Sequence, residues 1–277
     1  MLPLIILTGP TNSGKSETAL ALARKLDTEI ISADSMQVYK YFDIGTAKPS
    51  RSAREEIPHH LIDILDPDEE FNAFDFKVRA LKIIHELMDR DKIPILVGGT
   101  GLYIKVLAED YDCAEGGSPE IREKIRQDIR DQGVEEVYRE LQRIDPEYAA
   151  KICATDSLRI ERALGVYLDT GKRFSEFHDG DSPAPGRFPI HTFILERERA
   201  ELYSQIDQRV DKMIEDGLAN EVQSILESGY SPELKPFKSI GYAQMVQYHQ
   251  DSLTLDRAAY EIKRETRHYA KRQLTWF

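Results

Sequence analysis

Eight residues near the start of the chain have the spacing of a phosphate-binding loop. The segment reads GPTNSGKS and fits the pattern G-x-x-x-x-G-K-[ST], between the apolar run Leu4 to Thr8 and a segment of helical periodicity. In such a loop, backbone N–H groups bind phosphate oxygens, the lysine neutralises their charge and the last hydroxyl can hold Mg²⁺. The sequence therefore predicts a phosphate site formed by Gly9, Pro10, Thr11, Asn12, Ser13, Gly14, Lys15 and Ser16.

Two further polar residues follow predicted strands. Asp34 comes directly after Glu29 to Ser32, and Thr100 follows the apolar run Ile93 to Val97. Because ligands of open α/β sheets bind at the carboxyl ends of the strands, both side chains could face a ligand. Asp34 could equally cap the turn after it, and Thr100 could cap the helix that begins near Leu102. Their positions alone leave both alternatives open.

The acidic residue that helps to hold the metal in ordinary P-loop enzymes is not in its usual place. It follows a second apolar strand in those enzymes, whereas Ile93 to Val97 is followed here by GGTG. Asp63, within HLIDIL, is a possible substitute, although a structural role suits it better. His59 and His60 form a poor chelating pair, because adjacent residues of a strand point to opposite faces. An ATPase is therefore disfavoured, while a kinase of a small metabolite stays open.

Strands and helices alternate, which predicts an α/β fold: a P-loop NTPase-like parallel sheet core flanked by helices. Asn72 is a predicted helix N-cap, and Ser118 begins another helix with Pro119 in its first turn. Only helical patterns occur from Ser118 to about Phe177, so we predict an all-helical insertion domain. The predicted domains are 1–112 with 186–277 for the core and 113–185 for the insertion. The predicted strands are Leu4 to Thr8, Glu29 to Ser32, His60 to Leu65, Ile93 to Val97 and Ile190 to Leu195.

The composition, with 41% hydrophobic and 31% charged residues, is that of an ordinary globular chain. No apolar run approaches the roughly 20 residues that span a bilayer, and the N-terminus lacks the basic region of a signal peptide. Cys113 and Cys153 form no C-x-x-C motif, so we expect a cytoplasmic protein. The net charge of −12 repels nucleic acid at long range, so such a partner requires a local basic surface.

A series of longer blocks follows the loop. They are ISADSMQVYKYFDIGTAKP, PHHLIDILDP, LVGGTGLYIKVL, DSLRIERALGVYLDTG, RAELYSQIDQRVDKMIEDGLANEV, SIGYAQM and TRHYAKRQLTWF. In these blocks the chain closely resembles the tRNA dimethylallyltransferase (tRNA isopentenyltransferase) family over nearly its whole length. Members transfer a dimethylallyl group from dimethylallyl diphosphate to N6 of the adenine beside the tRNA anticodon, at position 37. The resemblance implies that the loop binds the diphosphate of this donor, with Mg²⁺ near Ser16, and that the insertion binds tRNA.

The resemblance also implies roles for single side chains. Asp34 matches the acid that takes a proton from the adenine amine, Arg199 matches an arginine at the diphosphate, and Thr100 matches a contact of the target nucleotide. A base is needed because the lone pair of an adenine amine is delocalised and the amine loses a proton as the bond forms. Asn12 stands where Ala is more usual in this family. The residues implied to contact tRNA here are Asp34, Ser35, Met36, Gln37, Thr100, Arg122, Leu158, Arg159, Ile160, Glu161 and Arg162.

A basic face on the last predicted helix is a further candidate for RNA contact. Lys263, Arg267 and Lys271 recur at i, i+4 and i+8, and Glu265 is the only acidic residue between positions 263 and 272. A solvated helix face is the alternative. For the arginines of the insertion, the alternative is pairing with neighbouring glutamates.

Three other functions share part of this pattern. A small-metabolite kinase would have the loop and Asp34 but would not need the insertion or the basic helix. An adenylate isopentenyltransferase performs the same chemistry on a free nucleotide, and the insertion with its arginines favours tRNA instead. A catalytically silent RNA-binding protein conflicts with the intact Lys15, Ser16 and Asp34. We expect a monomer with tRNA and dimethylallyl diphosphate as its substrates.

Overall fold

The computed structural model describes residues 2–108, 117–177 and 188–277. In this part of the chain, five parallel strands form one sheet in the order β3-β2-β4-β1-β5. The predicted parallel α/β core is therefore confirmed. The strands are β1 (Leu4–Thr8), β2 (Ile30–Ser32), β3 (His59–His60), β4 (Ile95–Val97) and β5 (Ile190–Ile194).

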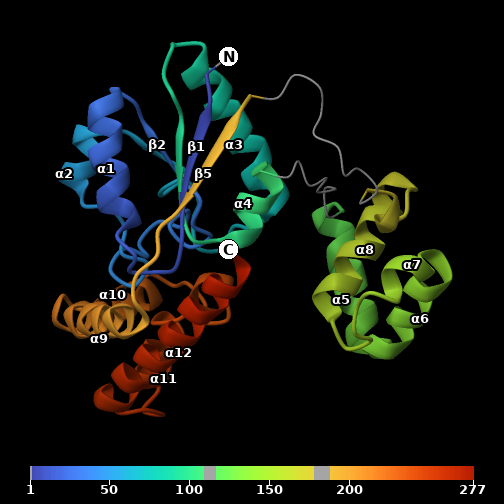
Figure 1. Ribbon diagram of the computed structural model, residues 1–277. Coiled ribbons are helices and arrows are strands. Elements are labelled where there is room, and N and C mark those ends of the chain that lie inside the picture. The colour runs from blue at the N-terminus through green and yellow to red at the C-terminus, as the bar shows by residue number, and fades with distance from the viewer. Residues whose placement is uncertain (1, 109–116, 178–187) are drawn as a thin grey trace. The chain divides into compact units, whose positions relative to one another are not determined.

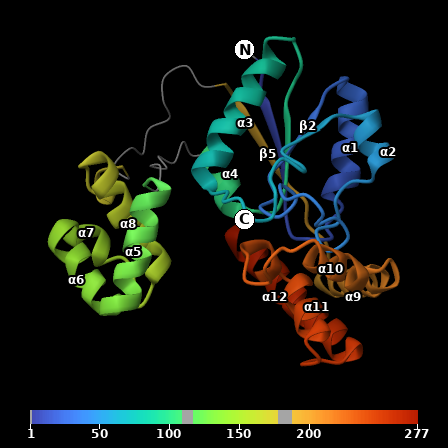
Figure 2. The same ribbon diagram turned by 180° about the vertical axis from the view of Figure 1, so that it is seen from behind.

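Helices cover the central strands on both faces. In Figures 1 and 2, α1 (Lys15–Leu26) and α2 (Arg51–Glu56) lie on one side of the sheet, and α3 (Ala73–Met88) and α4 (Gly101–Ala108) on the other. All residues of β2 and β4 are buried, as their continuous apolar sequences require. β5 is an edge strand and is mostly exposed.

The N-terminus of α3 confirms the predicted cap. The Asn72 side chain accepts hydrogen bonds from the backbone N–H groups of Phe74 (2.8 Å) and Asp75 (3.2 Å). The Asp75 carboxylate accepts one from the Asn72 N–H (2.9 Å), which completes a capping box. Ser118 likewise caps α5 (Pro119–Gln132), with Pro119 in the first turn.

The predicted strand from His60 to Leu65 is wrong, because β3 ends at His60. Leu61 and Asp63 have φ angles of 62° and 55°, a left-handed conformation that an extended strand cannot contain. The Asp63 carboxylate forms ion pairs with Lys48 and Arg54. These contacts confirm the structural role of Asp63, because its carboxylate is paired with two cations that stabilise the bend.

Four helices gather at the carboxyl ends of the strands (Figure 1): α9 (Arg199–Glu215), α10 (Leu218–Glu227), α11 (Tyr242–His249) and α12 (Leu255–Trp276). A short 3₁₀ helix, η2 (Lys235–Lys238), joins α10 to α11. Leu202 and Ile206 of α9 pack against Ala270 of α12 in a buried cluster. This buried apolar contact therefore holds α9 and α12 together. The two helices carry most of the cationic residues that are described below for the site.

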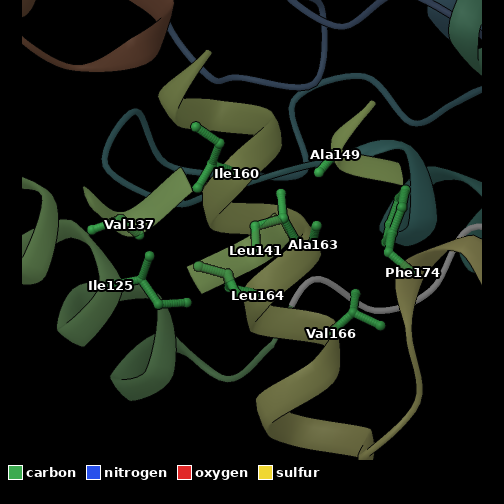
Figure 3. Close-up of a cluster of buried hydrophobic side chains, with 9 residues drawn as sticks. All are labelled: Ile125, Val137, Leu141, Ala149, Ile160, Ala163, Leu164, Val166 and Phe174. Atoms are coloured by element: carbon green, nitrogen blue, oxygen red, sulfur yellow. The ribbon is translucent and has the colours of Figure 1, made fainter. Parts of the chain in front are cut away.

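A second compact unit is entirely helical within its described residues. It contains α5, α6 (Val134–Ile144), α7 (Pro146–Ala149), α8 (Ser157–Thr170) and η1 (Phe174–Phe177). Its core draws side chains from each of these elements, as Figure 3 shows for Ile125, Leu141, Ala149, Ile160 and Phe174. Chain contacts separate the core, 1–104 with 188–277, from this unit, 105–187. The predicted boundaries, at 112/113 and 185/186, lie outside the described residues.

Among the described residues, every helix is too short or too polar to cross a lipid bilayer.

We predict that Leu141→Ala destabilises the helical unit by roughly 2–5 kcal/mol, because Leu141 is fully buried and its truncation leaves a cavity. Hydrogen exchange of the α5 to α8 amides should become faster, while amides of α1 and α3 keep their rates. Leu168→Ala is the control, since that leucine is 47% exposed. An equal effect of both variants would contradict the assignment of Leu141 to the core.

Candidate active site

A cavity of about 710 Å³ opens at the carboxyl ends of β1, β2 and β4. Its position follows from the sheet, because parallel strands deliver the residues after them to one edge. The phosphate loop forms one wall, the ends of β2 and β4 another, and α9 and α12 the rest. The lining residues that concern chemistry are Thr11, Asn12, Gly14, Lys15, Ser16, Asp34, Gln37, Gly98, Gly99, Arg197, Gln205, Gln208, Arg209, Lys212, Tyr269 and Gln273.

The loop from Gly9 to Ser16 connects β1 to α1, as its motif predicts. Gly9 has a φ angle of 136°, and a Cβ atom there would lie 2.3 Å from the Leu195 carbonyl oxygen. Only glycine fits this position. Asn12 has a φ angle of 64°, a left-handed conformation that asparagine tolerates better than most residues.

The Lys15 ammonium lies inside the loop. It donates hydrogen bonds to the carbonyl oxygens of Gly9 (2.8 Å) and Pro10 (2.5 Å). Burial lowers the pKa of Lys15 to about 8, while the nearby Asp34 raises it and Arg209 lowers it further. An anion in the loop would offset this desolvation, because it would give the charged form a partner.

Arg209 of α9 is a cation of the site that the sequence analysis missed. It lines the cavity and donates a hydrogen bond to the Asn12 Oδ1 atom (2.5 Å). The Asn12 amide in turn donates to the Gln205 carbonyl oxygen (2.9 Å), so Asn12 fastens the loop to α9. Burial lowers the pKa of Arg209, and Asp34 opposes that shift. Asn12, which stands where Ala is more usual in the family, therefore connects the loop to α9.

Arg199, which was expected at the diphosphate, does not line the cavity. Its guanidinium donates to the Tyr203 hydroxyl (3.1 Å) and lies 5.2 Å from the centre of that ring. The structure instead brings Arg197 and Arg209 to the loop, and Lys212 lines the same cavity. The sequence contained a signal for α9: Gln205, Gln208, Arg209 and Lys212 share one helical face, beside the apolar stripe that includes Ile206 and Val210.

Asp34 caps the turn that follows it and also lies at the cavity. Its Oδ1 atom accepts hydrogen bonds from the N–H groups of Met36 (2.8 Å) and Gln37 (3.3 Å), which caps the turn. The residue also lines the cavity. The Thr100 hydroxyl accepts a hydrogen bond from the Ser35 N–H (3.1 Å), so Thr100 supports the loop that carries Asp34.

Thr100 also stands at the N-cap position of α4, where its carbonyl oxygen accepts from the Tyr103 N–H (2.9 Å). Gln37 is fixed by two contacts: its amide donates to the Thr46 carbonyl oxygen (3.2 Å) and accepts from the Ser32 hydroxyl (3.0 Å). Ser35, Met36 and Thr100 therefore adjoin the wall that contains Asp34 and Gln37.

A half-buried carboxylate on α10 holds the loop after β2. Glu221 of α10 accepts hydrogen bonds from the N–H groups of Asp43 (3.1 Å) and Ile44 (2.8 Å) and from the Tyr242 hydroxyl (2.6 Å). Burial raises the pKa of Glu221, and these donors oppose the shift. This anchor positions Thr46 in the cavity wall.

The basic face of α12 is partly used inside the protein. Lys263 forms an ion pair with Asp211 (2.6 Å) and Arg267 one with Asp207 (2.7 Å), both carboxylates on α9. Lys271 is exposed and lines a shallow second cavity with His268, Arg272, Thr275 and Trp276. RNA contact by the three predicted residues stays a prediction, and of the three only Lys271 forms no ion pair within the described part of the chain.

The predicted RNA block of α8 needs correction. Ile160 is fully buried, and Glu161 is buried in an ion pair with Arg126 (2.9 Å), so neither side chain can reach an external ligand. Leu158 and Arg159 are exposed, and Arg159 pairs with Asp156 of its own helix (2.7 Å). Arg162 lies 5.8 Å from the centre of the Phe174 ring, and Arg122 is half-buried.

Both histidines of the pair make hydrogen bonds within the protein. His60 hydrogen-bonds the Glu29 carboxylate (2.7 Å), and the His59 ring hydrogen-bonds the Ile57 carbonyl oxygen (2.6 Å). His59 also lines the cavity. Within the described residues, no group of three or more His, Cys, Asp or Glu side chains could hold a metal ion by itself.

The fold and the cavity define a class: an α/β protein with a P-loop-like core and a cation-lined cavity at the carboxyl edge of its sheet. The chain belongs to the IPP transferase family, whose model matches residues 37–277.

Relatives with known names agree with this assignment. The chain is 46% identical over 274 residues to a tRNA dimethylallyltransferase of Heliobacterium modesticaldum, covering 99% of this chain and 86% of that protein. It is 47% identical to tRNA dimethylallyltransferase 1 of Citrifermentans bemidjiense, covering 99% and 88%.

Solved structures are similar over the whole chain. A tRNA isopentenylpyrophosphate transferase from Bacillus halodurans is 37% identical with a TM-score of 0.70, and the match covers 100% of this chain and 87% of that one. A eukaryotic dimethylallyltransferase captured acting on tRNA is 29% identical with a TM-score of 0.83, covering 100% and 70%.

We predict that affinity for inorganic pyrophosphate falls as the pH rises through about 8, the pKa of Lys15 in the free protein. A bound anion favours the charged ammonium, so binding above that pH takes up a proton and weakens by at most about tenfold per pH unit. Calorimetric titrations between pH 7 and 9.5 measure this, with Lys15→Arg as the control for titration of the ligand itself. Parallel pH profiles for the two proteins would contradict the prediction.

Proposed function

We propose that this protein transfers the dimethylallyl group of dimethylallyl diphosphate to N6 of adenine 37 in tRNA and releases diphosphate. The observation that carries the proposal is that the phosphate loop, its neighbouring cations and Asp34 all line the same cavity. The loop binds the group that leaves, and Asp34 lies where the group that attacks must arrive. Family membership supports the identity of both substrates.

The diphosphate side of the cavity stabilises the leaving group. As the allylic C–O bond breaks, its electron pair moves onto the diphosphate, so donors fixed in advance lower the barrier. Lys15 lies in the loop, and Arg209 is held against it by Asn12. Arg197 and Lys212 add positive charge from the α9 side. These groups take the place that Arg199 was expected to fill.

The adenine side supplies a base. Both backbone hydrogen bonds to Asp34 end on Oδ1, which leaves Oδ2 to accept a proton from the adenine amine. The nitrogen attacks the allylic carbon, diphosphate departs, and Asp34 takes the proton that the nitrogen loses. A positioned base contributes on the order of 10²–10⁴-fold to such a step.

The residues fit a magnesium ion shared with the substrate. Ser16 is exposed at the end of the loop and lines the cavity, and Mg²⁺ in such sites uses few protein ligands beside phosphate oxygens and water. Ser16 would hold the ion, which when bound neutralises charge on the diphosphate. The reaction would therefore depend on Mg²⁺.

A tRNA substrate is favoured over a free nucleotide. The protein with a TM-score of 0.83 to this chain is a dimethylallyltransferase acting on tRNA, and its match includes the whole helical unit. Exposed Leu158 and Arg159 on that unit and Lys271 on α12 are candidate contacts. We further propose a cytoplasmic monomer, as expected of a globular tRNA-modifying enzyme with one cavity per chain for both substrates.

We predict that purified protein with labelled dimethylallyl diphosphate and Mg²⁺ labels tRNA but not AMP. Labelling of AMP would favour an adenylate isopentenyltransferase, and phosphorylation of metabolites by ATP would favour a kinase. Asp34→Asn should lower the single-turnover rate by about 10²-fold or more with tRNA affinity unchanged, because only the base is lost. A rate near that of the unmodified protein would remove Asp34 as the base.

A matched pair of arginine variants distinguishes the two candidates for the diphosphate. Arg209→Ala should weaken pyrophosphate binding and slow single turnover by about 10²-fold, because it removes a buried cation from the leaving group. Arg199→Ala should leave both within threefold, since that side chain stacks on Tyr203 outside the cavity. Binding titrations and rapid quench measure the two effects, and the reverse ranking would return Arg199 to the site.

A further inference from the structure

Gln273, on α12, joins the two sides of the cavity. Its side chain is buried, with 5% of the residue exposed. The Oε1 atom accepts a hydrogen bond from the Thr11 N–H (2.8 Å), and Nε2 donates one to the Gly99 carbonyl oxygen (2.9 Å). One carboxamide therefore holds both the phosphate loop after β1 and the glycine segment after β4.

The two attached segments carry different substrates in the proposed reaction. Thr11 belongs to the loop that binds the donor diphosphate. Gly99 precedes Thr100, whose hydroxyl supports the loop of Asp34 through Ser35. Because Gln273 bonds to the backbone of both, a change in its side chain can shift one segment relative to the other.

The glycines after β4 admit the end of α12 at close range. A Cβ atom on Gly99 would lie 2.3 Å from the Gln273 Nε2 atom, and one on Gly101 would lie 2.3 Å from the Trp276 Nε1 atom. A side chain at either position would therefore have to displace the Gln273 carboxamide or the Trp276 ring. The GGTG sequence after β4 thus packs closely against the end of α12.

Tyr269 lies on α12 one turn before Gln273. It lines the cavity, and burial raises its pKa to about 12, with a contribution from the charge of Asp34 and an opposing hydrogen bond from Gln273. The phenol is therefore neutral at physiological pH. The end of α12 thus faces the adenine side of the cavity as well as the phosphate loop.

We propose that Gln273 is a positioning residue, which sets the separation between the allylic carbon of the donor and the attacking nitrogen of the acceptor. The inference rests on the transfer reaction proposed above. It assigns to the last turns of α12 a part in building the catalytic centre, in addition to any contact with RNA. Productive transfer requires the reacting atoms to lie within about 3–3.5 Å, and an error of about 1 Å costs on the order of 10²-fold in rate.

The test compares Gln273→Met, which keeps the size of the side chain and loses both bonds, with Gln273→Glu. The glutamate keeps an acceptor for the Thr11 N–H and loses the donor to Gly99. Gln247→Met is the control, since Gln247 is exposed on α11, away from the cavity. For each protein, pyrophosphate affinity, tRNA affinity, melting temperature and single-turnover transfer are measured.

For Gln273→Met we expect transfer to slow 10- to 100-fold, with both affinities within threefold. A second readout is the partition of the donor. When the amine is misplaced, water attacks the allylic carbon instead, diphosphate leaves with the bonding electron pair, and dimethylallyl alcohol and a proton are released. The ratio of alcohol to prenylated tRNA should rise at least fivefold in Gln273→Met, rise less in Gln273→Glu, and not change in Gln247→Met.

An unchanged rate and partition in both Gln273 variants would overturn the inference, as would a rate loss fully accounted for by weaker pyrophosphate binding. If Gln273→Met does not fold, the partition in Gln273→Glu decides alone. Transfer by the unmodified protein distinguishes this outcome from failure of the proposed function. If it prenylates tRNA while the variants behave normally, only the role of Gln273 fails, and if it prenylates nothing, the proposed function fails.

Discussion

The order of three parallel strands is the constraint on which the site depends. β1 carries the phosphate loop, β2 carries Asp34, and β4 lies between them. Neighbouring strands are about 4.8 Å apart, so the starts of the two functional loops are separated by roughly 10 Å. In the proposed reaction, that separation leaves room between the diphosphate and the base for the allylic carbon and the attacking amine. The intervening strand must then end in residues that do not fill the gap, and Gly98 and Gly99 meet this requirement.

Charge in the cavity is opposite in sign to that of the whole chain. The net charge is −12, yet Lys15, Arg197, Arg209 and Lys212 all line the cavity. Burial lowers the pKa of Lys15 and of Arg209, so the free protein keeps these cations at an energetic cost. A diphosphate offsets this cost and a neutral ligand cannot. The cavity therefore selects its ligand by charge, although the field of the whole molecule at long range is repulsive to anions.

The sequence allowed prediction of those features that depend on neighbours along the chain. The position of the loop from Gly9 to Ser16 between a strand and a helix, the Asn72 cap and the parallel core each follow from local pattern, and each is confirmed. The supposed strand from His60 to Leu65 failed because left-handed residues and the ion pairs of Asp63 override a weak alternation. Arg209 was missed because its place at the site comes from the fold: α9 follows β5, and only tertiary packing brings Arg209 to Asn12, 197 residues earlier in the chain.

The spacing of Lys263, Arg267 and Lys271 shows why a basic stripe on a helix has more than one explanation. Residues four apart face one way, and a neighbouring helix with acidic side chains at similar spacing matches them as well as a phosphate backbone does. Asp207 and Asp211 of α9 provide that match for two of the three cations. Exposed ion pairs contribute only about 0.2–1 kcal/mol each, so the buried seam between Leu202, Ile206 and Ala270 must hold the helices together. The ion pairs instead fix how α9 is turned against α12, and that orientation directs Arg209 toward the phosphate loop.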